Sequence, residues 1–196
     1  MKYNCTGVIL AGGSNSRMPG IQKSFHEIKG KKIIDFIYEL FSSIFDKIII
    51  VTNNPLDFAA WDAMIITDIY PFRCSLAGIH AGLFYSSKNQ IFVSACDTPF
   101  LKKELIEYIL SQRKKEFDVV IPETNDGLEP LCAVYFNKCL PRIEKNLNNK
   151  IFMIKKFFKK NRVKKISVNQ IKKIDPDMKS FFNINTYKDL QIARTM

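Results

Sequence analysis

The amino-acid sequence predicts an α/β fold in which a mostly parallel central sheet is covered on both faces by helices. Two observations support this prediction. Short apolar runs alternate with helical patterns through the first 120 residues, as in parallel sheets whose strands are joined by helices. Several of these runs are apolar throughout, which is typical of strands buried on both faces. Ligands of such sheets bind beyond the carboxyl ends of the strands.

Short apolar runs in this part of the chain are predicted to be buried strands. They are Cys5–Ala11, Lys47–Thr52, Met64–Thr67, Ile91–Ala95 and Asp118–Ile121. Helices are predicted between them, and the first of these carries six apolar residues at helical spacing. The predicted helices are Lys32–Phe45, Leu76–Ser87 and Lys102–Lys115.

The last third of the chain is less regular. Leu131–Phe136 predicts a further strand that leads into a helix over Lys138–Asn148. Ile151–Lys160 places apolar residues on one face and lysines on the other, which indicates a core-facing helix with a basic outer face. Thr186 suits the N-cap of a final helix over Tyr187–Arg194.

Composition places the chain among globular proteins, with 46% hydrophobic and 25% charged residues. No apolar run approaches the roughly 18 residues of a membrane span, and the first residues do not resemble a signal peptide. We therefore expect a cytoplasmic protein with no membrane partner. No repeat or linker divides the sequence, so residues 1–196 are predicted to form a single domain. The five cysteines show no metal-ligand spacing and are expected to be reduced thiols.

The formal net charge is +11, from 30 Lys and Arg against 19 Asp and Glu. Such an excess attracts polyanions, so nucleic acid is one partner to consider. Much of the excess lies between Lys155 and Lys173, however, and no nucleic-acid-binding motif accompanies it. We therefore expect a solvated basic face and no nucleic-acid partner. A weaker hypothesis is that these lysines help to attract an anionic substrate.

The segment Leu10–Gly13 (LAGG) follows the first predicted strand, and Arg17 and Lys23 come shortly after it. Glycines let the backbone approach a triphosphate closely, and backbone amides can point at its oxygens. The two cations would supply fixed positive charge. The spacing fits neither the P-loop nor the dinucleotide-binding pattern. An ordinary turn with two surface cations is the alternative, but the combination favours phosphate binding.

A second motif, Cys96–Pro99 (CDTP), directly follows the predicted strand Ile91–Ala95. A carboxylate at this position, Asp97, is well placed to bind Mg²⁺ that bridges nucleotide phosphates. A turn or helix N-cap is the alternative role of an aspartate before Thr-Pro. The phosphate-binding loop on the first strand favours the metal site.

A third motif, LAGIHAG, places Gly78 and Gly82 four residues apart, so that on a helix they clear one face for a backbone or a ligand. Ordinary packing of the helix on a strand explains the spacing equally well. His80 within this motif and His26 have no evident partner in the sequence, and we assign neither a catalytic role.

The motifs LAGGSNSRM…K, LAGIHAG, CDTPF and FFNINT stand in the order seen in the molybdenum cofactor guanylyltransferases, and the sequence resembles that family from about Gly7 to Leu190. The resemblance implies a Rossmann-like three-layer nucleotidyltransferase fold. It also implies Mg²⁺-dependent transfer of GMP from GTP to the terminal phosphate of molybdopterin, with release of pyrophosphate. GTP and molybdopterin would be the main partners, and other cofactor-biosynthesis proteins and recipient molybdoenzymes would be further ones.

The resemblance also assigns site residues, motif by motif. Arg17, Lys23 and Asp97 would be catalytic, and Asp97 would bind Mg²⁺. Asn183 and Asn185 would shape the acceptor side. The residues implied to bind the nucleotide are Leu10, Ala11, Gly12, Gly13, Lys23, Asn53, Asp68, Gly78 and Asp97. The acids Asp175 and Asp177, which precede the FFNIN motif, are expected to be surface loop residues rather than metal ligands.

The sequence departs from the family's usual pattern at Pro19, Gln22, Val51 and Cys74–Ser75. Pro19 replaces a glycine, and Gln22 stands where an aspartate commonly precedes the lysine. These differences leave a choice between GTP and CTP open. The alternatives are a cytidylyl- or other nucleotidyltransferase acting on molybdopterin or a sugar or polyol phosphate, and a non-catalytic cofactor carrier. A mere carrier would not require a metal-binding carboxylate.

Overall fold

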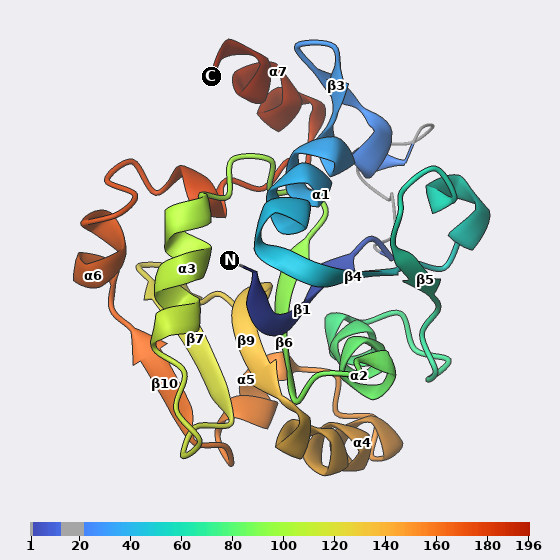
Figure 1. The fold of residues 1–196 in the computed structure, drawn as a ribbon, viewed down its shortest axis with the longest axis vertical. Coiled ribbons are helices and arrows are strands. Elements are labelled where there is room, and N and C mark those ends of the chain that lie inside the picture. The colour runs from blue at the N-terminus through green and yellow to red at the C-terminus, as the bar shows by residue number, and fades with distance from the viewer. Residues whose placement is uncertain (1, 13–21) are drawn as a thin grey trace.

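A mostly parallel sheet runs through the molecule in the computed structural model, which describes residues 2–12 and 22–196 (Figure 1). From edge to edge the strands are β10 (Val163–Ile166), β7 (Val119–Thr124), β9 (Cys132–Phe136), β6 (Gln90–Ala95), β1 (Tyr3–Leu10), β4 (Phe45–Val51) and β5 (Met64–Ile66). The short β8 (Gly127–Leu128) pairs only with β7. Strand β9 runs antiparallel to both of its neighbours, and every other pair along this order is parallel. The mostly parallel sheet predicted from the sequence is confirmed.

Helices cover both faces of the sheet. One apolar core joins the sheet to α1 (Ile33–Ile44), α3 (Lys103–Ser111) and α6 (Val168–Lys172), and a second joins it to α2 (Ser75–Tyr85), α4 (Leu140–Asn148) and α5 (Ile154–Phe158). Strand β4 shows how one strand serves both cores. Its Ile48 and Ile50 belong to the first core, and Ile49 and Val51 to the second. Successive residues from Ile48 to Val51 are therefore all apolar, and the predicted three-layer arrangement is confirmed.

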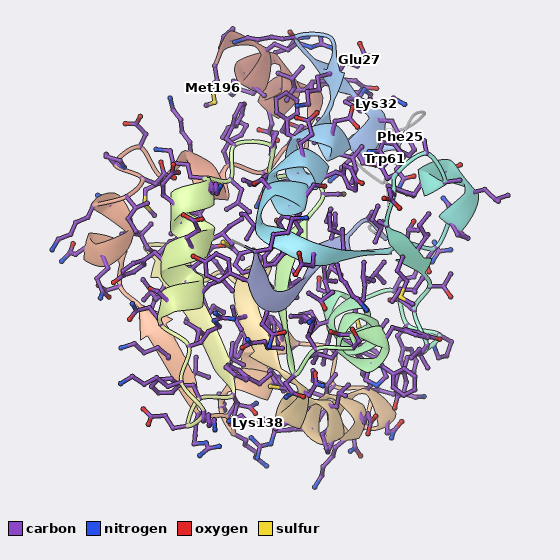
Figure 2. All side chains as sticks on the ribbon, in the orientation of Figure 1. Phe25, Glu27, Lys32, Trp61, Lys138 and Met196 are labelled. Atoms are coloured by element: carbon purple, nitrogen blue, oxygen red, sulfur yellow. The ribbon has the colours of Figure 1, made fainter. Side chains whose placement is uncertain are left out.

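A small third core lies beside the main layers, where α7 (Tyr187–Thr195) packs on the hairpin of β2 (Glu27–Ile28) and β3 (Lys31–Lys32) (Figure 1). Lys29 and Gly30 form its turn with φ values of 51° and 79°, as expected for a tight two-residue hairpin. The Lys32 ammonium lies over the rings of Phe25 and Trp61, which stack on each other (Figure 2).

Four 3₁₀ turns complete the described elements: η1 (Lys23–Phe25), η2 (Pro55–Phe58), η3 (Asn137–Cys139) and η4 (Lys179–Phe181). Thr186 caps α7 as expected, because its side chain accepts a hydrogen bond from the Asp189 N–H at 3.2 Å while the Asp189 carboxylate accepts one from the Thr186 N–H at 2.8 Å. Across residues 2–12 and 22–196, no helix is long and apolar enough to cross a bilayer.

The region between α4 and η4 differs most from the sequence-based expectation. The helix predicted over Ile151–Lys160 is wrong at both ends, because α5 covers only Ile154–Phe158. The Ile151 N–H instead donates to Asn146 O at 2.8 Å and ends the turn that follows α4. Strand β10 and helix α6 were not expected, since β10 is four residues long and two of these are lysines.

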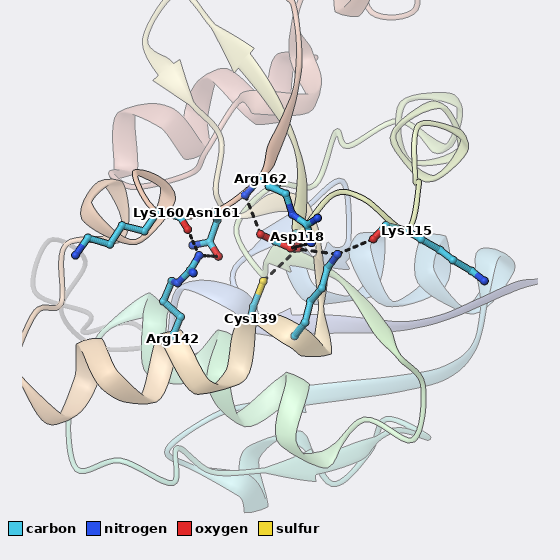
Figure 3. A network of polar contacts seen from close by, with 8 residues as sticks. Lys115, Asp118, Cys139, Arg142, Lys160, Asn161 and Arg162 are labelled. Atoms are coloured by element: carbon cyan, nitrogen blue, oxygen red, sulfur yellow. Dashed lines mark hydrogen bonds and ion pairs between the residues drawn. The ribbon is translucent and has the colours of Figure 1, made fainter.

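The carboxylate of Asp118 anchors this region to the sheet (Figure 3). It accepts a hydrogen bond from the Arg162 N–H at 2.8 Å and pairs with Arg162 Nη2 at 3.2 Å and Lys138 Nζ at 3.1 Å. Burial alone would raise the pKa of Asp118, but the hydrogen bonds from Arg162 and Lys138 outweigh it and lower the pKa. The carboxylate therefore fixes the starts of β7 and β10 to each other.

Candidate active site

Three strands bring the first two motifs to one edge of the sheet. Leu10 pairs in register with Val51 of β4 and Ala95 of β6. The bonds continue one residue further, because the Ala11 N–H donates to Val51 O at 2.8 Å and the Cys96 N–H donates to Leu10 O at 3.1 Å. The segments that follow β1, β4 and β6 therefore leave the sheet side by side at its carboxyl edge, where ligands of parallel sheets bind.

A cleft of about 340 Å³ lies at this edge. Most of the residues that we expected to bind the nucleotide line it, and these are Leu10, Ala11, Gly12, Lys23, Asp68, Gly78 and Asp97. Asn53 does not line the cleft, but its Nδ2 donates a hydrogen bond to Gly12 O at 3.4 Å. Gly13 and Arg17 lie outside the described residues. We call this cleft the first cavity.

Glycine lets neighbouring side chains lie close to the backbone at two positions of the first cavity. A Cβ atom on Gly12 would lie 3.3 Å from Asn53 Nδ2. A Cβ atom on Gly78, near the start of α2, would lie 3.1 Å from Leu10 Cδ2 and 3.7 Å from Asp68 Oδ1. Gly78 therefore lets α2 approach the end of β1 and the carboxylate of Asp68.

Asp68 brings a half-buried carboxylate into the first cavity. Its Oδ1 is shielded from solvent and has no hydrogen-bond partner within the described part of the chain. Burial raises the pKa of Asp68, because an unpaired carboxylate is more costly to ionise away from water. The oxygen is therefore ready to accept a hydrogen bond from a ligand in this cavity.

A second cavity, of about 310 Å³, lies next to the first. Asn183 and Asn185, which we expected on the acceptor side, both line it. The two cavities share three lining residues, and these are Ala95, Asp97 and Leu131. Asp97 thus stands where the two cavities meet.

The loop after β6 is held against the FFNIN segment at this junction. The Ile184 N–H donates to Asp97 O at 3.0 Å, and Lys23 Nζ donates to Asn185 Oδ1 at 2.9 Å. Burial raises the pKa of the Asp97 carboxyl, and the nearby Lys23 ammonium acts in the opposite direction. Three residues from separate predicted motifs, Lys23, Asp97 and Asn185, are therefore brought together.

Several residues that line the cavities were missed by the sequence reasoning. Arg73 adds a second cation to the first cavity, and Glu129 adds a carboxylate to the second. Gln22 Nε2 donates to Ala11 O at 3.0 Å, so this departure from the family pattern makes a neutral bond to the end of β1. Arg73 directly precedes Cys74–Ser75 before the LAGIHAG motif, and this adjacency was the available signal for it.

The expectation for the acids before FFNIN is wrong for Asp175. Its side chain is fully buried, pairs with Lys102 Nζ at 2.9 Å and accepts a hydrogen bond from the Ser180 N–H at 2.8 Å. Asp177 is 70% exposed and pairs with Lys179, as a surface residue does. Neither carboxylate lines a described cavity wall, so Asp175 supports the FFNIN segment rather than contacting a ligand.

The histidines and the cysteines also carry reactive side chains, and the described residues show no site built from them. His80 is buried in α2, where its Nε2 lies 3.3 Å from Glu144 Oε1 and its ring meets Tyr70 edge-on. Neither His80 nor His26 lines the two cavities as described. All five cysteines are free thiols, as expected.

The junction of the two cavities suits Mg²⁺ that is held partly by substrate and water, rather than a metal ion held by protein ligands alone. The described residues contain no cluster of three or more His, Cys, Asp or Glu side chains that could hold a metal. Mg²⁺ is commonly held by one or two carboxylates together with substrate phosphates and waters. The single carboxylate of Asp97, beside a cleft with Lys23 and Arg73, suits that kind of binding.

Comparisons with known proteins agree with this geometry. A family model described as the MobA-like NTP transferase domain matches residues 7–164. The molybdenum cofactor guanylyltransferase of Desulfosudis oleivorans is 45% identical to this chain over 188 residues, which are 96% of this chain and 93% of the relative.

Solved structures show the same architecture. Molybdopterin-guanine dinucleotide biosynthesis protein A from Archaeoglobus fulgidus has a TM-score of 0.86 and 30% identity, with 97% of each chain covered. A 4-diphosphocytidyl-2C-methyl-D-erythritol synthase from Anaerococcus prevotii has a TM-score of 0.68 and 19% identity, covering 99% of this chain and 95% of the other. At that identity the second likeness shows the fold alone.

Proposed function

We propose that this chain, which belongs to the family of MobA-like NTP transferase domains, transfers GMP from GTP to the terminal phosphate of molybdopterin. The products would be the guanine dinucleotide form of the cofactor and pyrophosphate. The whole chain would act as one nucleotidyltransferase domain. The observation that carries the proposal is the position of Asp97 between two adjoining cavities, because a transferase needs its donor and its acceptor on either side of the reacting phosphorus.

The first cavity would hold GTP. It is lined by residues 10–12 of the LAGG segment and by two cations, Lys23 and Arg73, which suit a triphosphate. Arg17, outside the described residues, would add a further cation. Asp68 and Gly78, which also line this cavity, would contact the nucleoside part, where Asp68 Oδ1 needs a donor. Asn53 would support the loop through its bond to Gly12.

The chemistry would consist mainly of positioning and charge stabilisation. An oxygen of the acceptor phosphate attacks the α-phosphorus of GTP, the bond from that phosphorus to the bridging oxygen breaks, and pyrophosphate leaves. A phosphate monoester is already anionic, so no strong general base is needed. Lys23 would hold negative charge at the junction, and its bond to Asn185 would fix its direction.

Asp97 would hold Mg²⁺ at this point. When bound, Mg²⁺ would neutralise the phosphoryl oxygens and favour attack on phosphorus. The carboxyl must be ionised to do so. Lys23 opposes the effect of burial on the pKa of Asp97, and so helps to keep it in the binding form.

The experiment is to measure pyrophosphate release by the purified protein with Mg²⁺ and molybdopterin, comparing GTP, CTP, ATP and UTP. We expect release with GTP and only background release with the other three. Release with CTP alone would assign the protein to a cytidylyl branch. Tight nucleotide binding without release from any of the four would support a non-catalytic carrier and contradict the proposal.

A further inference from the structure

The two cavities differ sharply in charge. Lys23 and Arg73 line the first, whereas the described lining of the second contains two carboxylates, Asp97 and Glu129, and no Lys or Arg. A phosphate deep in the second cavity would therefore face negative charge without a fixed cation. The acceptor's phosphate is better placed at the junction, beside Lys23 and Asp97. A neutral part of the acceptor must then occupy the rest of the second cavity.

Glu129 is held firmly in the wall of the second cavity. Its N–H donates to Pro122 O at 3.0 Å, and its carbonyl accepts a hydrogen bond from the Cys132 N–H at 3.1 Å. Its carboxylate Oε1 accepts a hydrogen bond from Thr124 Oγ1 at 2.8 Å. An ionised carboxylate offers about four acceptor positions and no donor. Glu129 can therefore accept further hydrogen bonds from a ligand without moving.

The other polar groups of this cavity are partly used within the protein. Ser94 Oγ and Thr98 Oγ1 lie 3.1 Å apart, and Thr98 Oγ1 also donates to Ala95 O at 3.0 Å. Asn185 Oδ1 accepts the bond from Lys23. Leu101 and Phe181 add apolar surface. The cavity therefore suits a largely neutral group that presents hydrogen-bond donors to a carboxylate.

We propose that Glu129 selects the acceptor by accepting hydrogen bonds from a donor edge of its heterocycle. The proposal rests on the proposed function, because the pterin ring of molybdopterin carries an amino group beside a ring nitrogen that can bear hydrogen. Such a pair of donors matches a carboxylate as a guanidinium does. The heterocycle then lies in the second cavity with the phosphate directed to Asp97.

The competing explanation is that Glu129 only shapes the loop. The substitution Glu129→Gln separates this explanation from recognition of the acceptor. The glutamine carbonyl still accepts the bond from Thr124, so the loop keeps its support. Its amino group, however, would set a donor against the donors of the ligand and leave them unpaired. Glu123→Gln is a matched control, because Glu123 lies on β7 beside Thr124, lines neither cavity as described, and pairs with Lys165 Nζ at 2.7 Å with its side chain 41% exposed.

The test uses two phosphate-free probes, pterin and lumazine, which differ in that lumazine has a carbonyl in place of the amino group. Their binding to the full-length protein is followed by their fluorescence in the presence of GTP. We expect the unmodified protein to bind pterin roughly tenfold more tightly than lumazine. Glu129→Gln should lose roughly tenfold in pterin affinity and little in lumazine affinity. Glu123→Gln should match the unmodified protein.

Affinity for GTP should stay within about twofold in Glu129→Gln, because Glu129 does not line the first cavity as described. A pterin preference that survives in Glu129→Gln, or no pterin binding by the unmodified protein, would overturn this inference even if GMP transfer occurs. Selective pterin binding that depends on Glu129, without any GMP transfer, would overturn the proposed function and leave the assignment of the cavity standing.

Discussion

The surroundings of Asp97 act on the pKa of its carboxyl in opposite directions. It is half-buried at the junction of two cavities, where burial raises its pKa, and Lys23 acts to lower it. A carboxylate that only capped a turn would not need a second cavity beside it. The same position suits a residue that holds a metal ion between a donor and an acceptor phosphate.

The first prediction concerns this carboxylate. Asp97→Asn should lower kcat for GMP transfer by roughly 10²–10³, because a neutral amide binds Mg²⁺ poorly at the point where charge develops. Thermal unfolding should be nearly unchanged, since the backbone hydrogen bond to this carboxylate comes from Asp97 itself and an asparagine oxygen can accept it in its place. Asp177→Asn is the control, as Asp177 is exposed and away from the cavities. A near-normal kcat for Asp97→Asn would remove Asp97 from the mechanism.

The raised pKa of Asp97 gives a second prediction, on pH. A carboxyl with a raised pKa takes up its proton at higher pH than an ordinary aspartate does. Turnover should therefore fall on acidification while the pH is still above the usual aspartate range, because the protonated acid cannot hold Mg²⁺. The pH profile of kcat/KM, measured with Mg²⁺ below saturation so that proton and metal compete for the carboxylate, checks this. An acidic limb that starts only below the usual range would be inconsistent with it.

Among single residues, the sequence predicted the site residues that belong to a motif and missed those that do not. Asp97, Lys23 and Asn185 stand in recognisable motifs and meet at one point. Glu129 reaches the second cavity from a short loop between β8 and β9, where a single acidic residue has no pattern around it. Only the folded sheet brings it opposite the others.

At the scale of elements, α2 shows two uses of glycine within one helix. A Cβ atom on Gly82 would lie 2.8 Å from Val8 Cγ1 and 3.3 Å from Ile91 Cδ1, both of which belong to buried strand residues. A Cβ atom on Gly78 would meet the more flexible end of Leu10. Gly82 thus serves packing on the sheet, and Gly78 serves the first cavity.

The third prediction tests this difference between Gly82 and Gly78. Gly82→Ala should destabilise the fold by about 1–2 kcal/mol, because the clash with stiff Val8 exceeds the gain of roughly 1 kcal/mol in helix propensity. Gly78→Ala should leave stability nearly unchanged, since Leu10 can shift, but the shift should raise the KM for GTP several-fold. Chemical denaturation and steady-state kinetics of both variants measure the two effects. Equal effects of both variants would contradict the division.

The segment that leads into FFNIN gives the fourth prediction. Burial would raise the pKa of Asp175, but the hydrogen bonds from Lys102 and Ser180 outweigh it and lower the pKa. The ionised form therefore stabilises the fold above the unfolded pKa, and this contribution is lost as the pH falls through the folded value. Asp175→Asn should lower Tm by roughly 5 °C near neutral pH. The gap should close at acidic pH, and a gap independent of pH would argue against an ionised Asp175.

Element prediction succeeded where a strand or helix is long and strongly patterned. The run Ile48–Val51 is apolar throughout because β4 contributes to two cores. Strand β10 could not be found in the same way, because it has only four residues, two of them lysines, and lies at the edge of the sheet. The order of the strands, including the reversed β9, depends on contacts between distant segments and is not written in any local pattern.

At the scale of the whole molecule, the basic excess is a surface property. The lysines that carry it between residues 156 and 173 are largely exposed, as expected of a solvated face. Charge of one sign over a surface raises the rate at which an oppositely charged ligand arrives, and salt screens it.

The fifth prediction follows from this charge. The KM for molybdopterin should rise several-fold between low and roughly 0.5 M salt, while kcat changes little, because screening affects arrival and not the bound arrangement. Steady-state kinetics at constant pH measure it, with a neutral inhibitor such as pterin as the reference. A molybdopterin KM indifferent to salt would remove the basic face from substrate capture.

The central claim, that GMP passes from the first cavity to a phosphate at the junction, has one direct test. The purified protein is given molybdopterin and Mg²⁺ with GTP labelled either at the α-phosphorus or at the γ-phosphorus. We expect the α-label to move to the acceptor and the γ-label to leave in pyrophosphate, and we expect both events to be lost in Asp97→Asn. Movement of the γ-label to the acceptor, or its release as orthophosphate, would contradict it.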